Sequence, residues 1–295
     1  MLNLETLAEI ANQNQEDLQL QVAEFTVGPG EVHVGITPQL MGVINMSTDS
    51  WYRESICLNT ESAIERGKVL STQGASIIDI GAESTLPEAQ VLDANGQLDK
   101  VLPVVEALAQ SAIAVSVETY DLEVVRQSLK AGAAVINLTG KSDSSAIYSE
   151  VASANAAVII CFVQGENVRE VEQLKLDEDS VPLLEDYFAR EIKKAQAEGV
   201  NKIFIDPGLG FYYSNLNDGE QRVRRQMGVF LNTFRLRKLG WPVCHALPHA
   251  FDYFGEEVRS AEAFFAVLAS LGKTSLFRTH EIPRVKAVLD TLQAY

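Results

Sequence analysis

The feature that most constrains the fold of this chain is an eightfold alternation of short apolar segments with longer segments of helical periodicity. The short segments are rich in β-branched residues and apolar at successive positions, as expected of parallel strands buried on both faces. Strands are predicted at residues 40–45, 75–80, 113–118, 133–138, 157–162, 202–206, 241–246 and 275–278. Helices are predicted at residues 60–73, 98–110, 122–131, 145–154, 181–199, 220–240, 260–272 and 282–293.

Eight consecutive strand–helix units predict a closed α/β fold, the TIM (β/α)8 barrel, rather than an open sheet. Such a barrel occupies about 250 residues, which fits residues 40–295. Residues 1–39 contain a polar helix candidate and two alternating segments around Gly28-Pro29-Gly30. This pattern predicts a β-hairpin that closes the bottom of the barrel. We therefore expect an N-terminal extension, 1–39, and one barrel domain, 40–295.

Charge and hydropathy limit the possible partners. The 295 residues include 24 Lys and Arg but 40 Asp and Glu, a net charge of −16, which argues against nucleic acid or an anionic membrane surface. The N-terminus lacks the features of a signal peptide, and no segment approaches the roughly 18 apolar residues of a membrane span. Three separated cysteines, Cys57, Cys161 and Cys244, indicate thiols in a reducing compartment. We expect a cytoplasmic protein that binds a small molecule.

Polar side chains recur where the predicted strands end, which is the catalytic face of a TIM barrel. Any one aspartate or asparagine among them is better explained as a helix cap or a turn residue. Together they predict a polar floor for an amino-substituted heterocycle, whose flat faces would contact Phe211 or Phe162. The polar residues at or just after strand ends are Asn45, Asp79, Glu118, Asn137, Asp206, His245, His249, Arg278 and His280.

Two shorter patterns leave alternatives open. Arg278 and His280 lie two residues apart on one strand, so they share a side and could hold an anion such as a phosphate, but His280 could equally be a packed structural histidine. The glycines of Asp206-Pro-Gly-Leu-Gly-Phe211 permit close approach of a ligand, but they also suit a tight turn. The four histidines and three cysteines do not have zinc-motif spacing.

The strand-end motifs resemble those of dihydropteroate synthase, the pterin-binding barrel family of folate synthesis. The resemblance spans residues 40–292 and recurs at nearly every strand end. It is carried by Met41-Gly-Val-Ile-Asn-Met-Ser-Thr-Asp-Ser-Trp51, Ile77-Ile-Asp-Ile-Gly-Ala-Glu-Ser-Thr-Leu-Pro87, Val115-Ser-Val-Glu-Thr-Tyr120, Val135-Ile-Asn137, Ile205-Asp-Pro-Gly-Leu-Gly-Phe211 and Phe277-Arg-Thr-His280.

The resemblance implies a role for each matching residue. Asn45 would ligate Mg²⁺ or the leaving pyrophosphate, and Arg278 and His280 would bind pyrophosphate, so these three are the expected catalytic residues. Thr85, in the second loop, and His249 are expected near the anion. The expected pterin-binding residues are Asp79, Glu118, Asn137, Asp206, Gly210 and Phe211.

The implied reaction condenses a 6-hydroxymethyl-dihydropterin pyrophosphate with p-aminobenzoate. The resemblance also implies a homodimer formed through the last helices, which fits the nearly uniformly apolar segment 261–271, although a well-buried helix would look the same.

Several family residues are replaced. Leu86 stands where the family has an arginine, Leu138 where it has an aspartate, and 247–255 replaces its Ser-Arg-Lys-Ser segment without any lysine. His249 is the nearby group that could partly substitute. These replacements leave two alternatives open, a pterin-binding paralogue without synthase turnover and a methyltetrahydrofolate-dependent methyltransferase. Arg278 and His280 argue against the methyltransferase.

Overall fold

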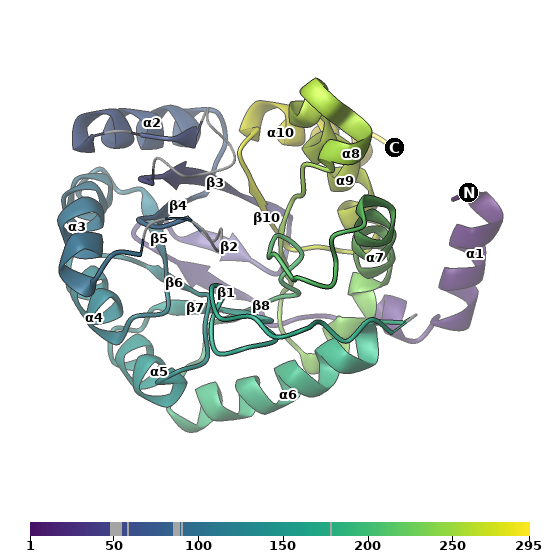
Figure 1. The fold of residues 1–295 in the computed structure, drawn as a ribbon, viewed down its shortest axis with the longest axis horizontal. Coiled ribbons are helices and arrows are strands. Elements are labelled where there is room, and N and C mark those ends of the chain that lie inside the picture. Colours follow the sequence, from purple (N-terminus) through teal and green to yellow (C-terminus); the bar gives the residue numbers. More distant parts are fainter. Residues whose placement is uncertain (48–54, 58, 85–88, 90, 178) are drawn as a thin grey trace.

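The computed structural model describes residues 1–47, 55–57, 59–84, 89, 91–177 and 179–295. Its centre is a parallel eight-stranded sheet in the order β8-β7-β6-β5-β4-β3-β10-β9 (Figure 1). The edge strands meet through a parallel bridge between Ile205 and Val243, where the Ile205 amide donates to the Pro242 carbonyl at 3.1 Å. The predicted (β/α)8 barrel is therefore confirmed, with strands β3 (Gln39–Asn45), β4 (Ile77–Gly81), β5 (Ala114–Thr119), β6 (Val135–Leu138), β7 (Ala157–Cys161), β8 (Ile203–Asp206), β9 (Cys244–Ala246) and β10 (Leu276–Thr279).

Helices surround the strands, as predicted, while the N-terminal helix α1 lies at the periphery (Figure 1). Helix α3 begins four residues before its predicted start, because the Asp93 carboxylate accepts from the Gly96 amide at 2.8 Å and caps it. No described helix is long and apolar enough to cross a membrane. The helices are α1 (Leu4–Gln13), α2 (Thr60–Thr72), α3 (Ala94–Gln110), α4 (Leu122–Lys130), α5 (Ser144–Ser153), α6 (Val181–Ala197), α7 (Gly219–Asn232), α8 (Phe251–Phe254), α9 (Val258–Leu271) and α10 (Ile282–Gln293), with 3₁₀ turns η1 (Asp17–Gln19), η3 (Thr233–Leu239) and η4 (Gly255–Glu257).

The predicted hairpin is also confirmed and closes the amino end of the barrel. Strands β1 (Phe25–Val27) and β2 (Val32–Val34) pair antiparallel. Val27 and Val34 are buried with apolar residues from the first positions of the barrel strands. Gly28 has φ +71°, and a Cβ there would lie 2.6 Å from the Ala114 Cβ, so only glycine fits this approach. Since the hairpin fills this end, a ligand reaches the barrel interior from the carboxyl end.

Candidate active site

The carboxyl ends of the strands surround a cavity of about 170 Å³. Its walls combine strand-end polar groups with two loops, 209–213 after β8 and 247–251 after β9. The strand-end residues in its wall are Asn45, Glu118, Arg278 and His280, and the loops contribute Gly210, Phe211 and His249. Seven of the predicted site residues thus face one cavity. Thr85 lies outside the described residues.

Beneath this cavity, four strands bring their polar side chains into one hydrogen-bonded network. The buried Asp79 carboxylate accepts from Arg278 Nε at 2.7 Å, from Ser116 Oγ at 2.6 Å and from Asn137 Nδ2 at 3.1 Å. Arg278 Nη2 donates to Glu118. Buried charges require such pairing because removal from water is otherwise very unfavourable. The network gives the barrel a polar floor, and it pairs Arg278 with the carboxyl groups of Asp79 and Glu118.

Burial changes the ionisation of the floor. It raises the pKa of Glu118 to about 7, aided by the charges of Asp79 and Asp206 and opposed by Arg278. Burial also raises the pKa of Asp206 to about 6, although the Gly208 amide and Arg278 act in the opposite direction. Burial alone would lower the pKa of Arg278, but Glu118 and Asp79 outweigh it and raise the pKa. The site therefore contains a permanent cation and two carboxyl groups that can hold a proton close to neutral pH.

The turn after β8 positions the aromatic wall. Asp206 Oδ1 accepts from the Gly208 amide at 2.7 Å, and Gly208 has φ +68°. A Cβ on Gly208 would lie 2.3 Å from the Phe162 carbonyl oxygen, so the tight-turn explanation of this glycine holds. The turn leads directly into Gly210 and the half-buried Phe211 at the cavity wall. An aromatic face therefore lies beside the polar floor.

Strand β7 contributes a group that the sequence analysis did not assign. Cys161 Sγ lies 3.3 Å from Asn137 Oδ1 and donates to it, while the Asn137 NH₂ group is bonded to Asp79. Burial raises the pKa of the Cys161 thiol well above its ordinary value, so the thiol keeps its proton as a donor. A cysteine at the end of an apolar strand carried no sign of this contact in the sequence.

The two histidines at β9 and in the loop that follows it have different environments. His245 is fully buried away from the cavity, with Nε2 2.8 Å from Thr233 Oγ1 and its ring against Phe230. Burial lowers the pKa of His245 to about 3, so it is a neutral packing residue. His249 instead lines the cavity together with His280.

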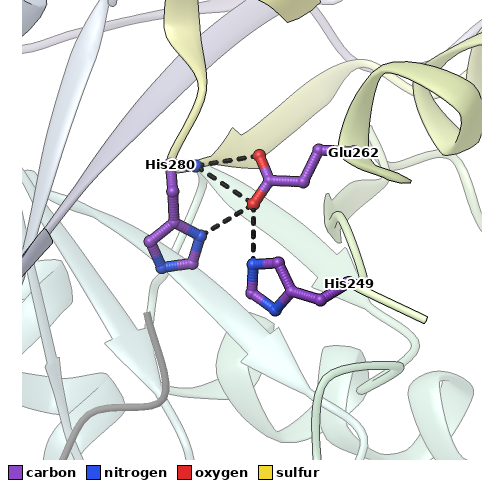
Figure 2. Close-up of side chains that lie close together, drawn as sticks. All are labelled: His249, Glu262 and His280. Carbon is purple, nitrogen blue, oxygen red and sulfur yellow. Dashed lines mark hydrogen bonds and ion pairs between the residues drawn. The ribbon is translucent and has the colours of Figure 1, made fainter. Parts of the chain in front are cut away.

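A buried glutamate joins His249 and His280 (Figure 2). Glu262 of α9 lies with Oε1 at 3.1 Å from His249 Nε2 and at 2.8 Å from His280 Nδ1. Burial alone would raise the pKa of Glu262, but the hydrogen bonds from the two histidines outweigh this and lower the pKa. Segment 261–271 was predicted to be an apolar helix, either at a dimer interface or well buried, and Glu262 was not assigned to the site. The available signal was the single acidic residue in the otherwise apolar segment 261–269, and the structure buries this residue completely.

Comparison with known proteins supports the relationship that the motifs suggested. The model of the pterin binding enzyme family matches residues 41–246. The dihydropteroate synthase of Escherichia coli is 31% identical over 261 residues, which cover 87% of this chain and 91% of that protein. A probable bifunctional folylpolyglutamate synthase/dihydropteroate synthase of Halobacterium salinarum is 30% identical over 98% of this chain, which spans only 35% of that longer protein.

Solved structures agree in fold. The dihydropteroate synthase of Xanthomonas albilineans with 4-aminobenzoic acid superposes with a TM-score of 0.77 at 25% identity, over 92% of this chain and 98% of that one. The dihydropteroate synthase of Clostridium difficile, determined in the presence of pteroic acid, has a TM-score of 0.74 at 26% identity, over 88% and 97% of the two chains.

Proposed function

Because this chain belongs to the family of pterin-binding enzymes, we propose that it acts as a dihydropteroate synthase, condensing 6-hydroxymethyl-dihydropterin pyrophosphate with p-aminobenzoate in folate biosynthesis. The observation that carries this proposal is the polar floor of Asp79, Asn137, Glu118 and Arg278 beneath a cavity walled by Phe211. The relatives described above are synthases, which favours this reaction over the methyltransferase and over a paralogue without turnover.

In this reaction the amine nitrogen of p-aminobenzoate forms a bond to the exocyclic methylene carbon of the pterin. The carbon–oxygen bond to pyrophosphate breaks, the bonding electrons leave with the pyrophosphate, and the amine loses one proton. The chain must therefore hold the ring, orient the amine and stabilise the negative charge of the leaving group.

The residues of this chain divide between those tasks. Asp206, Asn137 and the Glu118 carboxyl supply hydrogen-bonding groups of the kind that an amino-pyrimidinone edge requires, and Phe211 supplies a flat apolar face. Arg278 and His280 lie at the cavity wall as groups for the pyrophosphate. The pairing of Arg278 with Asp79, and with Glu118 when that carboxyl group is ionised, reduces the positive charge that Arg278 offers to the anion.

We propose that Asn45 also holds Mg²⁺. Its side chain faces the cavity, and Nδ2 donates to Ser55 Oγ at 2.6 Å, which orients the amide. The amide oxygen is the hard ligand type that Mg²⁺ prefers, and the ion typically completes its shell with water and substrate phosphates. Bound there, Mg²⁺ would neutralise part of the pyrophosphate charge.

A homodimer and a cytoplasmic location are further parts of the proposal. Phe264 and Leu271 of α9 are 42% and 50% exposed, an apolar surface that a second copy would cover. The buried free thiols of Cys57, Cys161 and Cys244 suit a reducing compartment. Light scattering of the wild type and of Phe264→Glu tests the dimer, since the substitution should leave a monomer.

The test of the reaction is to incubate the purified chain with dihydropterin pyrophosphate, Mg²⁺ and p-aminobenzoate and to measure pyrophosphate release. We expect release that depends on the amine. Pterin binding without release would instead support the paralogue.

Asp206→Asn tests the pocket. The substitution keeps an oxygen for the Gly208 amide but removes the carboxylate, and the loss of a charged hydrogen bond of about 1.5–3 kcal/mol should weaken pterin binding by one to two decades. Asp290→Asn, on the exposed surface of α10, is the matched control and should bind as the wild type does. Unchanged binding by Asp206→Asn would contradict the pocket assignment.

A further inference from the structure

His249, Glu262 and His280 form a cluster that the synthase reaction does not explain. They come from the loop after β9, from α9 and from the end of β10, and Figure 2 shows both imidazoles directed at one carboxylate. One ligand atom from each residue lies within 4.8 Å of the other two. Two imidazoles and one carboxylate are a common ligand set for divalent transition metals.

We propose that this cluster, here named the His-Glu-His site, binds a divalent transition-metal ion of the Zn²⁺ type through His249 Nε2, Glu262 Oε1 and His280 Nδ1. The two nitrogens lie 3.1 Å and 2.8 Å from Glu262 Oε1. Ligand atoms bonded to one ion at about 2.0–2.2 Å are separated by roughly 3.0–3.5 Å, so small side-chain adjustments admit the ion.

The second oxygen of Glu262 is held by other donors. Oε2 accepts from the Thr279 hydroxyl, from the His280 amide at 3.0 Å and from the Glu281 amide at 3.3 Å. These bonds fix the carboxylate and orient Oε1 toward the imidazoles. In metal sites, residues that do not touch the metal commonly orient the ligands in this way.

The position of the site gives the ion an open side. His249 and His280 line the same cavity as Arg278, while Glu262 is fully buried. Three protein ligands with remaining positions toward a cavity are the arrangement of metal sites that accept water or substrate. A nitrogen-containing ligand set also separates this site from the Mg²⁺ site proposed at Asn45, which would use oxygen ligands.

The ion would also set the tautomer of His280. When Nδ1 donates a proton to Glu262, a neutral imidazole presents the lone pair of Nε2, which cannot donate to an anion. When Nδ1 binds a metal, Nε2 carries the proton and becomes a donor. The metal thus supplies both a cation and a directed N–H group at a cavity whose arginine is already paired with Asp79 and Glu118.

The consequence for pyrophosphate binding rests on the proposed function, whereas metal binding itself does not. The segment 247–255 contains no lysine, and the ion would restore positive charge beside it. With the metal bound, the His-Glu-His site would therefore bind an anionic phosphate oxygen of the substrate.

The test uses the full chain, freed of metal with a chelator and then titrated with Co²⁺ as a spectroscopic probe for Zn²⁺. We expect one Co²⁺ per chain with a visible absorption band, displaced by Zn²⁺. His249→Ala should weaken Co²⁺ binding by roughly a hundredfold or more, because it removes a direct ligand, whose loss exceeds the 10- to 100-fold effect of removing a supporting residue. His33→Ala removes an exposed histidine of β2 at the other end of the barrel and should bind as the wild type does.

Three results would overturn the proposal: no Co²⁺ binding by the wild type, equal binding by His249→Ala, or equal loss in His33→Ala. Circular dichroism and urea unfolding identify a variant that fails to fold, and His280→Gln then provides a second removal of a ligand. Asn45→Ala should leave Co²⁺ binding unchanged, which separates this site from the proposed Mg²⁺ site.

Binding of inorganic pyrophosphate tests whether the metal in the His-Glu-His site helps the chain to bind the pyrophosphate group. Protein loaded with one Zn²⁺ and desalted should bind pyrophosphate at least about tenfold more tightly than metal-free protein, and His249→Ala should lose this gain. If Co²⁺ binds but the condensation reaction does not occur, the His-Glu-His site stands and the proposed function fails. If the reaction occurs with Mg²⁺ and Co²⁺ does not bind, only the His-Glu-His site is refuted.

Discussion

The substitution Glu118→Gln tests whether burial or the charge of Arg278 has the larger effect on the pKa of Glu118 in the polar floor. The Glu118 side chain is 13% exposed and accepts from Arg278 Nη2. Burial favours its neutral form, while the Arg278 charge favours its ionised form. Burial raises the pKa of Glu118 to about 7, from an ordinary value of 4.5, so desolvation outweighs the ion pair. Glutamine has nearly the same shape and stays neutral at every pH.

The magnitude follows from proton linkage. A difference of about 2.5 pKa units between folded and unfolded chains, at 1.36 kcal/mol per unit, is about 3 kcal/mol. The folded chain binds this proton more tightly, so the stabilisation is fully present below about pH 4.5 and is lost as the pH rises through about 7. The free energy of unfolding of the wild type, minus that of Glu118→Gln, should therefore fall by about 3 kcal/mol between pH 4.5 and pH 8.

Urea unfolding of both proteins at half-unit steps of pH measures this difference. Subtraction removes the titration of groups that the two proteins share, including Asp206, apart from their coupling to Glu118. Glu123→Gln is the matched control, because the Glu123 side chain on α4 is 45% exposed and pairs with Arg126 at 2.7 Å. Its hydrogen bonds to Gln127 and Arg126 lower the pKa of Glu123, so its difference from the wild type should not fall across this range.

A flat difference would refute the reasoning for Glu118. A difference that rises with pH would show that the Arg278 ion pair dominates and that Glu118 is ionised throughout. Either result would also remove Glu118 as a proton-bearing group of the cavity near neutral pH.

Three further predictions concern single positions. Gly272→Ala should destabilise the chain by at least about 2 kcal/mol in urea unfolding, because the added Cβ would lie 1.8 Å from the Phe230 carbonyl oxygen. Gly228→Ala on α7 should instead stabilise the chain by about 0.5–1 kcal/mol, because the added Cβ would meet open space, and equal effects of the two substitutions would contradict this packing. Burial lowers the pKa of His245 to about 3, so its imidazole NMR signals should not titrate between pH 8 and pH 5, and a midpoint in that range would show that it is solvated. Phe211→Ala should weaken pterin binding in calorimetry by about 1–3 kcal/mol, five- to 150-fold, if its ring stacks on the pterin, and an unchanged affinity would exclude stacking.

The barrel could be predicted because its signal is local and repeated. A parallel strand covered on both faces must be apolar at successive positions, and each such segment, β7 for example, is visible without knowing its neighbours. The boundaries were less accurate where a side chain outside the periodic segment decides them. Because Asp93 caps α3, this helix begins earlier than its apolar pattern predicted. The segment after β9 forms the short helix α8, which the apolar pattern did not indicate.

The set of strand-end polar residues was likewise apparent, because the carboxyl ends of parallel strands meet at one face. The hydrogen-bonding partners of these residues could not be predicted from the sequence. The contacts of Arg278 with Asp79 and Glu118 join residues 199 and 160 positions apart, and the contact of Cys161 with Asn137 depends on which side each strand presents. The negative charge of −16 gave no hint that the floor balances its own arginine.

The sequence by itself determined the barrel, its hairpin and the face that carries the polar groups, since periodicity and strand ends are properties of contiguous residues. Only the tertiary structure decided that His245 packs in the core while His249 faces the cavity, and that Glu262 joins His249 to His280. The physical reason is that burial and charge pairing arise between elements distant in the chain. A lone glutamate on an apolar helix acquires its role only when folding removes it from water and brings two imidazoles to it.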